Sequence, residues 1–327
     1  MILEDKIYGK EEINENILID LINSNEIQRL KNVSQLGMPE EYFSKKGFSR
    51  YEHSLGVLIL LRKLGANLNE QVAGLLHDVN HTVFSHVVDW IFGDPTKEDY
   101  QDNNFLKFIK NSFIPKILKK YNFDIINLEN LKNYSLLEQD APSLCADRVD
   151  YSLRELAIDG FLKESVMIFR NLMNINGRIV IKNLEIGKLF YEKYSFLNKT
   201  SWSGEDSRMR YVILSNILKK AFEKDILCFE DLNKSEKDIL DILYESNEDY
   251  ILENLNLLKT GFNLIEDEKG IELKTKFRYI DPEIVFDENY EKLSNLSEEY
   301  RKIIEQEKEK AESFKRVQIK MIKENQN

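Results

Sequence analysis

Apolar residues recur at three- and four-residue steps along most of the chain, which is the spacing of one face of an α-helix. The first such stretch predicts a helix over residues 11–36. Residues 51–64 are apolar nearly all round, which predicts a buried helix. Asn67 or Asn69 can cap a third helix over residues 70–78, and a fourth helix is predicted to begin near Thr82.

The second half of the chain is also mainly helical in pattern. Asp140, followed by Ala141 and Pro142, predicts the start of a helix, and Gly160 predicts its end, so Asp147 is expected on this helix. Residues 178–182 and 271–280 are the two strand candidates. The tail, residues 293–327, is highly charged and predicts a solvated helix. The fold class is therefore mainly α, a helical core with a small α+β addition near the C-terminus.

Composition narrows the classes of function. The formal net charge of −11 disfavours a broad nucleic-acid surface, although a small basic pocket for one nucleotide is still compatible with it. The longest apolar run, residues 57–61, is too short to span a bilayer. Cys145 and Cys228 lie far apart, and no signal peptide is apparent, so we expect a reduced, cytoplasmic compartment and no membrane partner.

The four histidines of the chain, His53, His77, His81 and His86, all fall in one short stretch and are interleaved with carboxylates. The doublet His77-Asp78 ends a predicted helix, where both side chains can reach one metal ion. His53 and Asp147 would complete a set of two nitrogen and two oxygen ligands. Such a set suits a divalent ion with open positions, namely Mn, Fe, Ni, Mg or Zn. Spacing alone leaves three rivals to Asp147 open: Asp140, Asp150 and Asp159.

A second group next to this set has the spacing of an acid/base pair. His86 and Asp89 are three residues apart, so on a helix the carboxylate can orient the imidazole. His81 follows His77 by four residues and can share its side of the pocket. A single histidine on an apolar face is usually a core residue, but four histidines together favour a functional site.

These segments resemble the HD-domain superfamily, and within it the deoxynucleoside triphosphate triphosphohydrolases. Residues 50–57 read R-Y-E-H-S-L-G-V, residues 73–86 read A-G-L-L-H-D-V-N-H-T-V-F-S-H, and residues 146–151 read A-D-R-V-D-Y, each similar to a family motif. Upstream, I-Q-R-L at 27–30 and Q-L-G at 35–37 are similar to a further family segment. The likeness covers residues 1–225, which are expected to form the HD phosphohydrolase domain, and residues 226–327 a C-terminal helical or α+β lobe.

The resemblance implies a role for each matching residue. The implied metal ligands are His53, His77, Asp78 and Asp147. It implies catalytic roles for His86 with Asp89, as the pair that transfers a proton, and for His81, as a phosphate contact. The implied substrate-binding residues are Gln35 and Leu36 at the sugar edge, Arg50 and Arg148 on the phosphates, and Tyr151 on the sugar.

The chain departs from the family pattern at three places. The histidine of a later H-E motif is absent, because residues 96–100 read T-K-E-D-Y. A later His-Lys is also absent, and there Arg208, within G-E-D-S-R at 204–208, is the candidate replacement for substrate binding. Asn80 stands where the family has glycine.

The resemblance implies hydrolysis of a deoxynucleoside triphosphate (dNTP) to deoxynucleoside and tripolyphosphate, with a divalent metal ion as cofactor and the nucleotide as partner. It also favours a homo-oligomer. Two alternatives stay open. One is an HD phosphohydrolase that acts on a monophosphate, a cyclic dinucleotide or a short oligonucleotide. The other is a nucleotide-responsive regulatory protein with weak catalysis.

Overall fold

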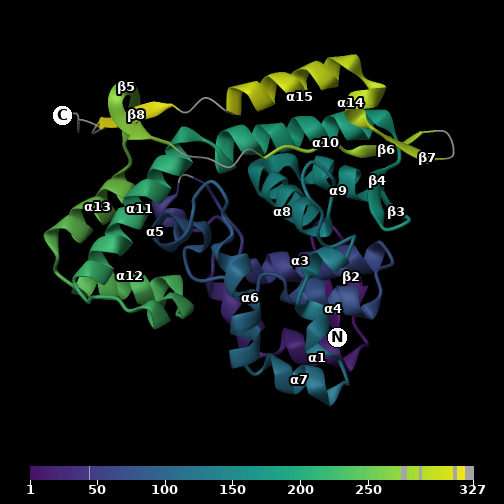
Figure 1. The fold of residues 1–327 in the computed structure, drawn as a ribbon, viewed down its shortest axis with the longest axis horizontal. Helices are drawn as coiled ribbons and strands as arrows, with labels where there is room; N and C mark the ends of the chain where they lie inside the picture. Colours follow the sequence, from purple (N-terminus) through teal and green to yellow (C-terminus); the bar gives the residue numbers. More distant parts are fainter. Residues whose placement is uncertain (44, 274–277, 287–288, 312–314, 321–327) are drawn as a thin grey trace.

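The computed structural model describes residues 1–327 except 44, 274–277, 287–288, 312–314 and 321–327. Helices dominate the described residues, and the third helix, α3, lies at the centre, where it packs against α4 and α8 (Figure 1). The helices that build this half are α1 (Asn16–Ile22), α2 (Asn25–Arg29), α3 (Arg50–Lys63), α4 (Leu68–Leu76), α5 (Asp89–Phe92), α6 (Tyr100–Asn111), α7 (Ile114–Lys120), α8 (Ala146–Leu156) and α9 (Leu162–Arg170).

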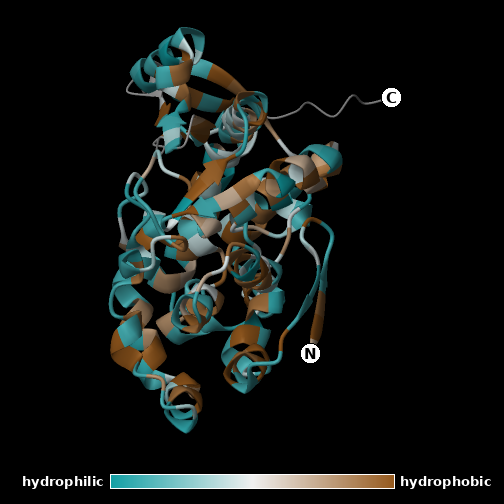
Figure 2. Ribbon diagram, turned by 90° about the vertical axis from the view of Figure 1, so that its right-hand side faces the viewer, coloured by the Kyte–Doolittle hydropathy of each residue, from teal (hydrophilic) through white to brown (hydrophobic). Residues whose placement is uncertain are grey.

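Local sequence explains where the two central helices begin. Ser49 caps α3: its hydroxyl accepts the Glu52 backbone N–H, and the Glu52 carboxylate accepts the Ser49 backbone N–H in return. Asn67 caps α4 by accepting the backbone N–H of Glu70 at 3.0 Å. Residues 53, 54 and 56–61 of α3 are all buried, as the nearly continuous apolar pattern predicts. Figure 2 shows the more usual arrangement elsewhere, with hydrophobic and hydrophilic residues on different sides of individual helices.

The C-terminal part adds helices and short strands to this core. Its helices are α10 (Leu184–Leu197), α11 (Glu205–Glu223), α12 (Glu236–Glu245), α13 (Asp249–Thr260), α14 (Leu293–Leu296) and α15 (Glu298–Ala311). Helix α15 lies along α10 (Figure 1), where its Glu307 carboxylate accepts hydrogen bonds from Tyr191, Ser195 and Lys199. Buried apolar residues from Ile7 to Val317 form one cluster, so this part packs on the same core.

The strands of the described residues form three small sheets. The order in the four-stranded sheet is β3-β4-β6-β7, with β4 and β6 parallel and the other pairs antiparallel. The two others are the antiparallel pairs β1-β2 and β5-β8. The strands are β1 (Ile2–Asp5), β2 (Gly9–Glu12), β3 (Leu172–Ile175), β4 (Arg178–Ile181), β5 (Asn263–Glu272), β6 (Glu283–Phe286), β7 (Asn289–Lys292) and β8 (Arg316–Lys320).

The mainly helical fold class with a small α+β addition is confirmed. The helix predicted at 51–64 is confirmed as α3, and the one predicted at 70–78 is confirmed as α4, although α4 starts two residues earlier and ends at Leu76, so that Asp78 lies in the following turn. The helix predicted over 11–36 is wrong in its extent, because residues 9–12 form a strand and Ser24 caps a new helix, α2. The helix predicted near Thr82 is also wrong. Phe84 and Ser85 have positive φ angles of 61° and 40°, which exclude a continuous α-helix there; residues Ser85–Val87 form only a 3-10 turn, and α5 begins at Asp89.

The helix start predicted at Asp140 is wrong as well. Helix α8 begins at Ala146, because the Arg148 guanidinium binds the carbonyls of Gln139 and Ser143 and holds the preceding residues in turns. Asp147 does lie on this helix, in its first turn. Gly160, at φ 95°, breaks the helix as predicted, although the chain enters α9 directly afterwards.

The strand predicted at 178–182 is confirmed as β4. The strand predicted at 271–280 is largely wrong: β5 begins at Asn263 and ends at Glu272, residues 274–277 lie outside the described residues, and residues 278–280 are not in a strand. The tail is helical over α15, but it then forms β8, whose Val317 is buried against β5. The division at residue 225 and the homo-oligomer stay predictions. Among the described residues, no helix combines the length and apolarity needed to cross a membrane.

Candidate metal centre

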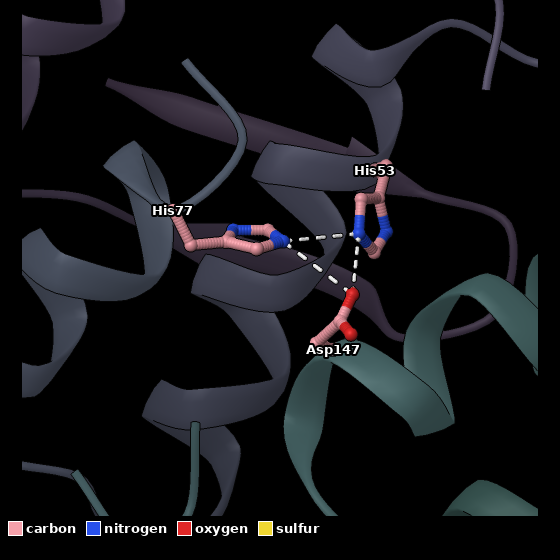
Figure 3. A group of neighbouring side chains, drawn as sticks. All are labelled: His53, His77 and Asp147. Atoms are coloured by element: carbon pink, nitrogen blue, oxygen red, sulfur yellow. Dashed lines mark hydrogen bonds and ion pairs between the residues drawn. The ribbon is translucent and has the colours of Figure 1, made fainter. Parts of the chain in front are cut away.

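Two histidines and one aspartate from three different helices point at a common centre (Figure 3). The Nε2 atom of His53 lies 2.9 Å from Asp147 Oδ1 and 3.2 Å from His77 Nε2. His77 Nε2 lies 3.5 Å from the same Asp147 oxygen. His53 sits in the first turn of α3, His77 at the C-terminal end of α4, and Asp147 in the first turn of α8. His53 and Asp147 are 94 positions apart in the sequence, and the packing of the helices brings them together.

The other ring nitrogen of each histidine is held by a hydrogen-bond acceptor. His53 Nδ1 donates to Asp150 Oδ2 at 2.7 Å, and His77 Nδ1 donates to the Gly74 carbonyl at 2.8 Å. Each contact orients its ring so that Nε2 faces the common centre. Carboxylates and backbone carbonyls are the usual acceptors that orient metal-binding histidines. The ligand atoms of His53, His77 and Asp147 lie within 4.8 Å of one another. The donor set therefore fits a divalent ion.

Asp78, the fourth predicted ligand, lies beside this group but is turned toward Arg50. One carboxylate oxygen is 3.6 Å from His77 Nε2 and the other is 3.7 Å from His53 Nε2. The second oxygen also pairs with the Arg50 guanidinium, which is buried. Burial raises the pKa of Asp78, but the charges of Arg50, His81 and His77 together outweigh that effect and hold the pKa well below its usual range. Asp78 is therefore ionised and can coordinate a metal ion while it pairs with the Arg50 guanidinium.

The charges of this group depend on one another. Burial lowers the pKa of His77, but the charges of Asp78 and Asp147 outweigh it and raise the pKa to about 9. Burial acts on Asp147 in the opposite sense, and its hydrogen bonds with His53 and His77 bring its pKa far below the usual range. Without an ion, His77 is therefore protonated at neutral pH, and a bound ion would displace the proton on Nε2.

Asp150, a rival of Asp147 in the sequence, supports the centre from behind. It is fully buried and binds Arg154 through both oxygens, at 2.8 and 3.1 Å. Arg154 continues to Asp5 on the N-terminal hairpin at 2.9 Å. Gly56 of α3 faces this pair on α8: a Cβ atom there would lie 1.9 Å from Arg154 Nη2 and 2.0 Å from Asp150 Oδ1. The glycine of the R-Y-E-H-S-L-G-V segment is therefore needed for close helix approach.

The predicted acid/base pair lies close to this group. His86 Nδ1 is 3.2 Å from Asp89 Oδ2, and the other Asp89 oxygen accepts the Tyr100 backbone N–H at 3.0 Å. Asp89 is fully buried while the His86 side chain is 28% exposed, so the imidazole can meet a solvent-borne ligand. The positive φ angles of Phe84 and Ser85, a strain found preferentially at functional sites, turn the chain just before His86.

His81 connects the two groups. Its Nε2 lies 3.1 Å from Asp78 Oδ1, and its ring meets the His86 ring edge-on with centroids 5.6 Å apart. Burial, reinforced by the Arg50 charge, lowers the pKa of His81 to about 3, so the ring is neutral at physiological pH. Its Nδ1 is buried and has no hydrogen-bond partner.

The structure places the predicted substrate residues unequally. Arg50 lies at the centre, donating to Ser85 Oγ at 2.8 Å and pairing with Asp78, and its buried Nη2 has no partner. Gln35 Oε1 is also buried without a partner. The Leu36 side chain is buried, and its carbonyl accepts the Tyr211 hydroxyl at 2.6 Å.

The other three predicted substrate residues have internal partners. The Arg148 guanidinium donates hydrogen bonds to the carbonyls of Gln139 and Ser143, so it stabilises the loop before α8. The Tyr151 ring lies 6.4 Å from the His53 ring, as a residue next to the centre should. Arg208 is 2% exposed and pairs with Glu98 at 3.2 Å.

Sequence reasoning missed three residues of this region: Glu98, Glu138 and Arg278. Glu98 pairs with both Arg208 and Arg278. Glu138, together with Cys145, lies within 4.8 Å of Asp147 by its ligand atoms, and burial with the Asp147 charge raises its pKa to about 7. No motif marks any of them, because each comes from a connecting segment outside the helices that carry the histidines.

Comparison with known proteins gives a consistent picture. The HD domain family profile matches residues 50–154. An uncharacterized protein of Bacillus subtilis, YdhJ, is 39% identical over 99% of this chain and 100% of its own length. The metal-dependent phosphohydrolase cns2 of Cordyceps militaris is 33% identical over 62% of this chain and 61% of its own length. A Dictyostelium discoideum homolog of the deoxynucleoside triphosphate triphosphohydrolase SAMHD1 is 27% identical over 59% of this chain and 44% of its own length.

Proposed function

The chain belongs to the HD-domain family, which includes metal-dependent phosphohydrolases, and on this premise we propose that it hydrolyses deoxynucleoside triphosphates to deoxynucleoside and tripolyphosphate. One observation carries the proposal. Arg50 is buried beside the ligand group, pairs with Asp78, and still has one buried N–H group without a partner. A buried, unpaired guanidinium donor is costly unless it serves a ligand, and a phosphate oxygen is the acceptor it fits best. The name of the Dictyostelium relative supports a dNTP as that ligand.

The residues divide the chemistry among them. His53, His77, Asp147 and Asp78 would hold the divalent ion, which when bound supplies Lewis-acid stabilisation of phosphoryl charge. Arg50 would neutralise a phosphate next to it and fix its orientation.

His86 would transfer the proton between the attacking water and the leaving group. Asp89, buried and held by the Tyr100 N–H, would orient the ring through its contact with Nδ1. Gln35, whose Oε1 is buried and unpartnered, and Leu36 would contact the sugar.

The test is a product analysis of the purified chain. Each of the four dNTPs, singly and mixed, is incubated with Mn²⁺, Mg²⁺, Fe²⁺, Ni²⁺ or Co²⁺, and the products are resolved by ion-exchange chromatography. We expect deoxynucleoside and intact tripolyphosphate. A His86→Ala variant that retains its metal is the control for adventitious phosphatase. No dNTP hydrolysis with metal bound to the wild-type chain would contradict the proposal.

A second candidate is hydrolysis of a smaller phosphoester, such as a nucleoside monophosphate. It is favoured by the sequence, which has no histidine beyond His86, and by Glu98, which occupies part of the hydrogen-bonding capacity of Arg208. The same chromatography separates the two functions, because orthophosphate replaces tripolyphosphate as the product. If nucleotide raises the melting temperature without turnover under any metal, the chain is instead a nucleotide-responsive regulatory protein.

A further inference from the structure

Three arginines from distant parts of the sequence act electrostatically on the Tyr211 hydroxyl. Arg50 lies on α3, Arg208 on α11, and Arg278 on the connection between β5 and β6. We call Arg50, Arg208 and Arg278 the arginine cluster. The Arg208 guanidinium carbon is 5.7 Å from the centre of the Tyr211 ring, and the Tyr211 hydroxyl donates to the Leu36 carbonyl. The cluster therefore borders the segment predicted to contact the sugar.

The cluster is linked by shared carboxylates. Glu98 pairs with Arg208 at 3.2 Å through one oxygen and with Arg278 through the other. Asp78 pairs with Arg50 and reaches the metal ligands. The carboxylates thus fix the guanidinium groups in place and restrict the loss of side-chain freedom when a ligand binds.

Arg278 has bonding capacity that these contacts do not use. Its side chain is 18% exposed, yet its Nη1 atom is buried and, among the described residues, meets no hydrogen-bond acceptor. Arg50 Nη2 is likewise buried and has no hydrogen-bond acceptor among the described residues. Buried donors on charged groups are normally paired, so these two donors within one cluster are available to an anionic ligand.

Arg278 is also linked electrostatically to aromatic residues near the metal centre. Its charge acts on the hydroxyls of Tyr151 and Tyr194, which lie 3.1 Å from each other. Tyr151 in turn packs near His53. Arg50 pairs with Asp78, whereas Arg278 pairs with Glu98 and interacts electrostatically with Tyr151 and Tyr194. Arg50 and Arg278 are thus anchored by different carboxylates, Asp78 and Glu98, so a ligand with several phosphate groups can offer a separate anionic group to each arginine.

From this arrangement we infer that Arg278 is a further substrate-binding residue, which contacts the outer phosphates of a polyphosphate while Arg50 contacts the phosphate nearest the metal centre. The inference rests on the proposed function and deepens it, because it assigns the preference for a polyphosphate chain to a residue of the C-terminal part. The competing explanation is that Arg278 serves only as a structural partner of Glu98.

The experiment measures binding of two inorganic probes, tripolyphosphate and orthophosphate, to the full chain by isothermal titration calorimetry in a chelator-containing buffer. The variants are Arg278→Gln, Arg278→Lys and, as the control, Arg301→Gln on the exposed side of α15. One lost charge-assisted hydrogen bond corresponds to a weakening of tripolyphosphate binding by roughly tenfold or more in Arg278→Gln. Orthophosphate binding should change by less than about twofold, because one phosphate reaches only Arg50. Arg278→Lys should give an intermediate value, because lysine keeps the charge but not the planar fork.

The outcomes separate the two explanations. A folded Arg278→Gln variant that binds tripolyphosphate as tightly as the wild type overturns the inference, and so does an equal loss for both probes. Undetectable tripolyphosphate binding by the wild type also overturns it. If Arg278→Gln does not fold, the ratio of the two probes in Arg278→Lys decides. Absence of dNTP hydrolysis by the wild type contradicts the proposed function alone, because the probe titration does not depend on turnover.

Discussion

The Gly56→Ala substitution tests how α3 and α8 together hold the candidate metal centre. A Cβ at this position would lie 1.9 Å from Arg154 Nη2 and 2.0 Å from Asp150 Oδ1, which is far inside van der Waals contact. Both contacted groups belong to a fully or largely buried ion pair, so neither can swing into solvent without breaking it. Asp150 would be displaced from His53, whose Nδ1 it now accepts at 2.7 Å.

The expected magnitude follows from these contacts. Breaking a buried ion pair costs about 3–5 kcal/mol of unfolding free energy. Alanine is favoured over glycine inside a helix by about 1 kcal/mol, which offsets part of the loss. We therefore expect a net loss of roughly 2–4 kcal/mol. Because His53 loses its orienting partner, metal affinity should also fall by about 10–100-fold.

The assay combines urea unfolding of the metal-free protein with metal titration against a chromophoric chelator. Gly74→Ala is the matched control: it lies on the neighbouring helix α4, and its Cβ would meet chiefly the flexible end of Leu61, at 2.2 Å. This control should keep its metal affinity. Equal unfolding free energy and equal metal affinity in the Gly56→Ala and Gly74→Ala variants would refute the reasoning.

Three further predictions concern single side chains. Burial raises the pKa of Glu236 to about 7 from 4.5, so its stabilising contribution is fully present below pH 4.5 and is lost as the pH rises through 7. Glu236→Gln, which keeps an acceptor for the Ser34 N–H, should match the wild type in urea unfolding near pH 4 and exceed it by up to about 3 kcal/mol at pH 8; a difference that does not vary with pH would contradict this. His86→Ala should lower kcat by about 100- to 10,000-fold without changing the bound metal measured by mass spectrometry, and full turnover would remove His86 from the mechanism. Asp147→Asn should lose metal and activity together, and a variant with a full metal content would show that Asp147 is not a ligand.

Local sequence accounts for the helices that carry the site and for the residues at its centre. Ser49 and Asn67 cap α3 and α4 through contacts within one turn, so the positions of His53 and His77 on these helices follow from nearby residues. The confinement of the histidines to one stretch marked the ligand group, and the structure brings His53, His77 and Asp147 together. Helix boundaries were less predictable where distant contacts decide them, as at Arg148, whose bonds to loop carbonyls delay the start of α8.

By itself, the sequence determined what depends on neighbours along the chain: the mainly helical fold class, the capped helices, and the histidine and aspartate positions that are proposed as metal ligands. Only the tertiary structure decided which groups stand behind and around them. In the folded chain, Asp150 accepts a hydrogen bond from His53 Nδ1, and Gly56 allows α3 to approach the Asp150–Arg154 pair. Arg278 pairs with Glu98, which lies 180 residues away in the sequence. Those contacts join segments whose spacing carries no periodic signal, because they are fixed by the packing of the helices in three dimensions.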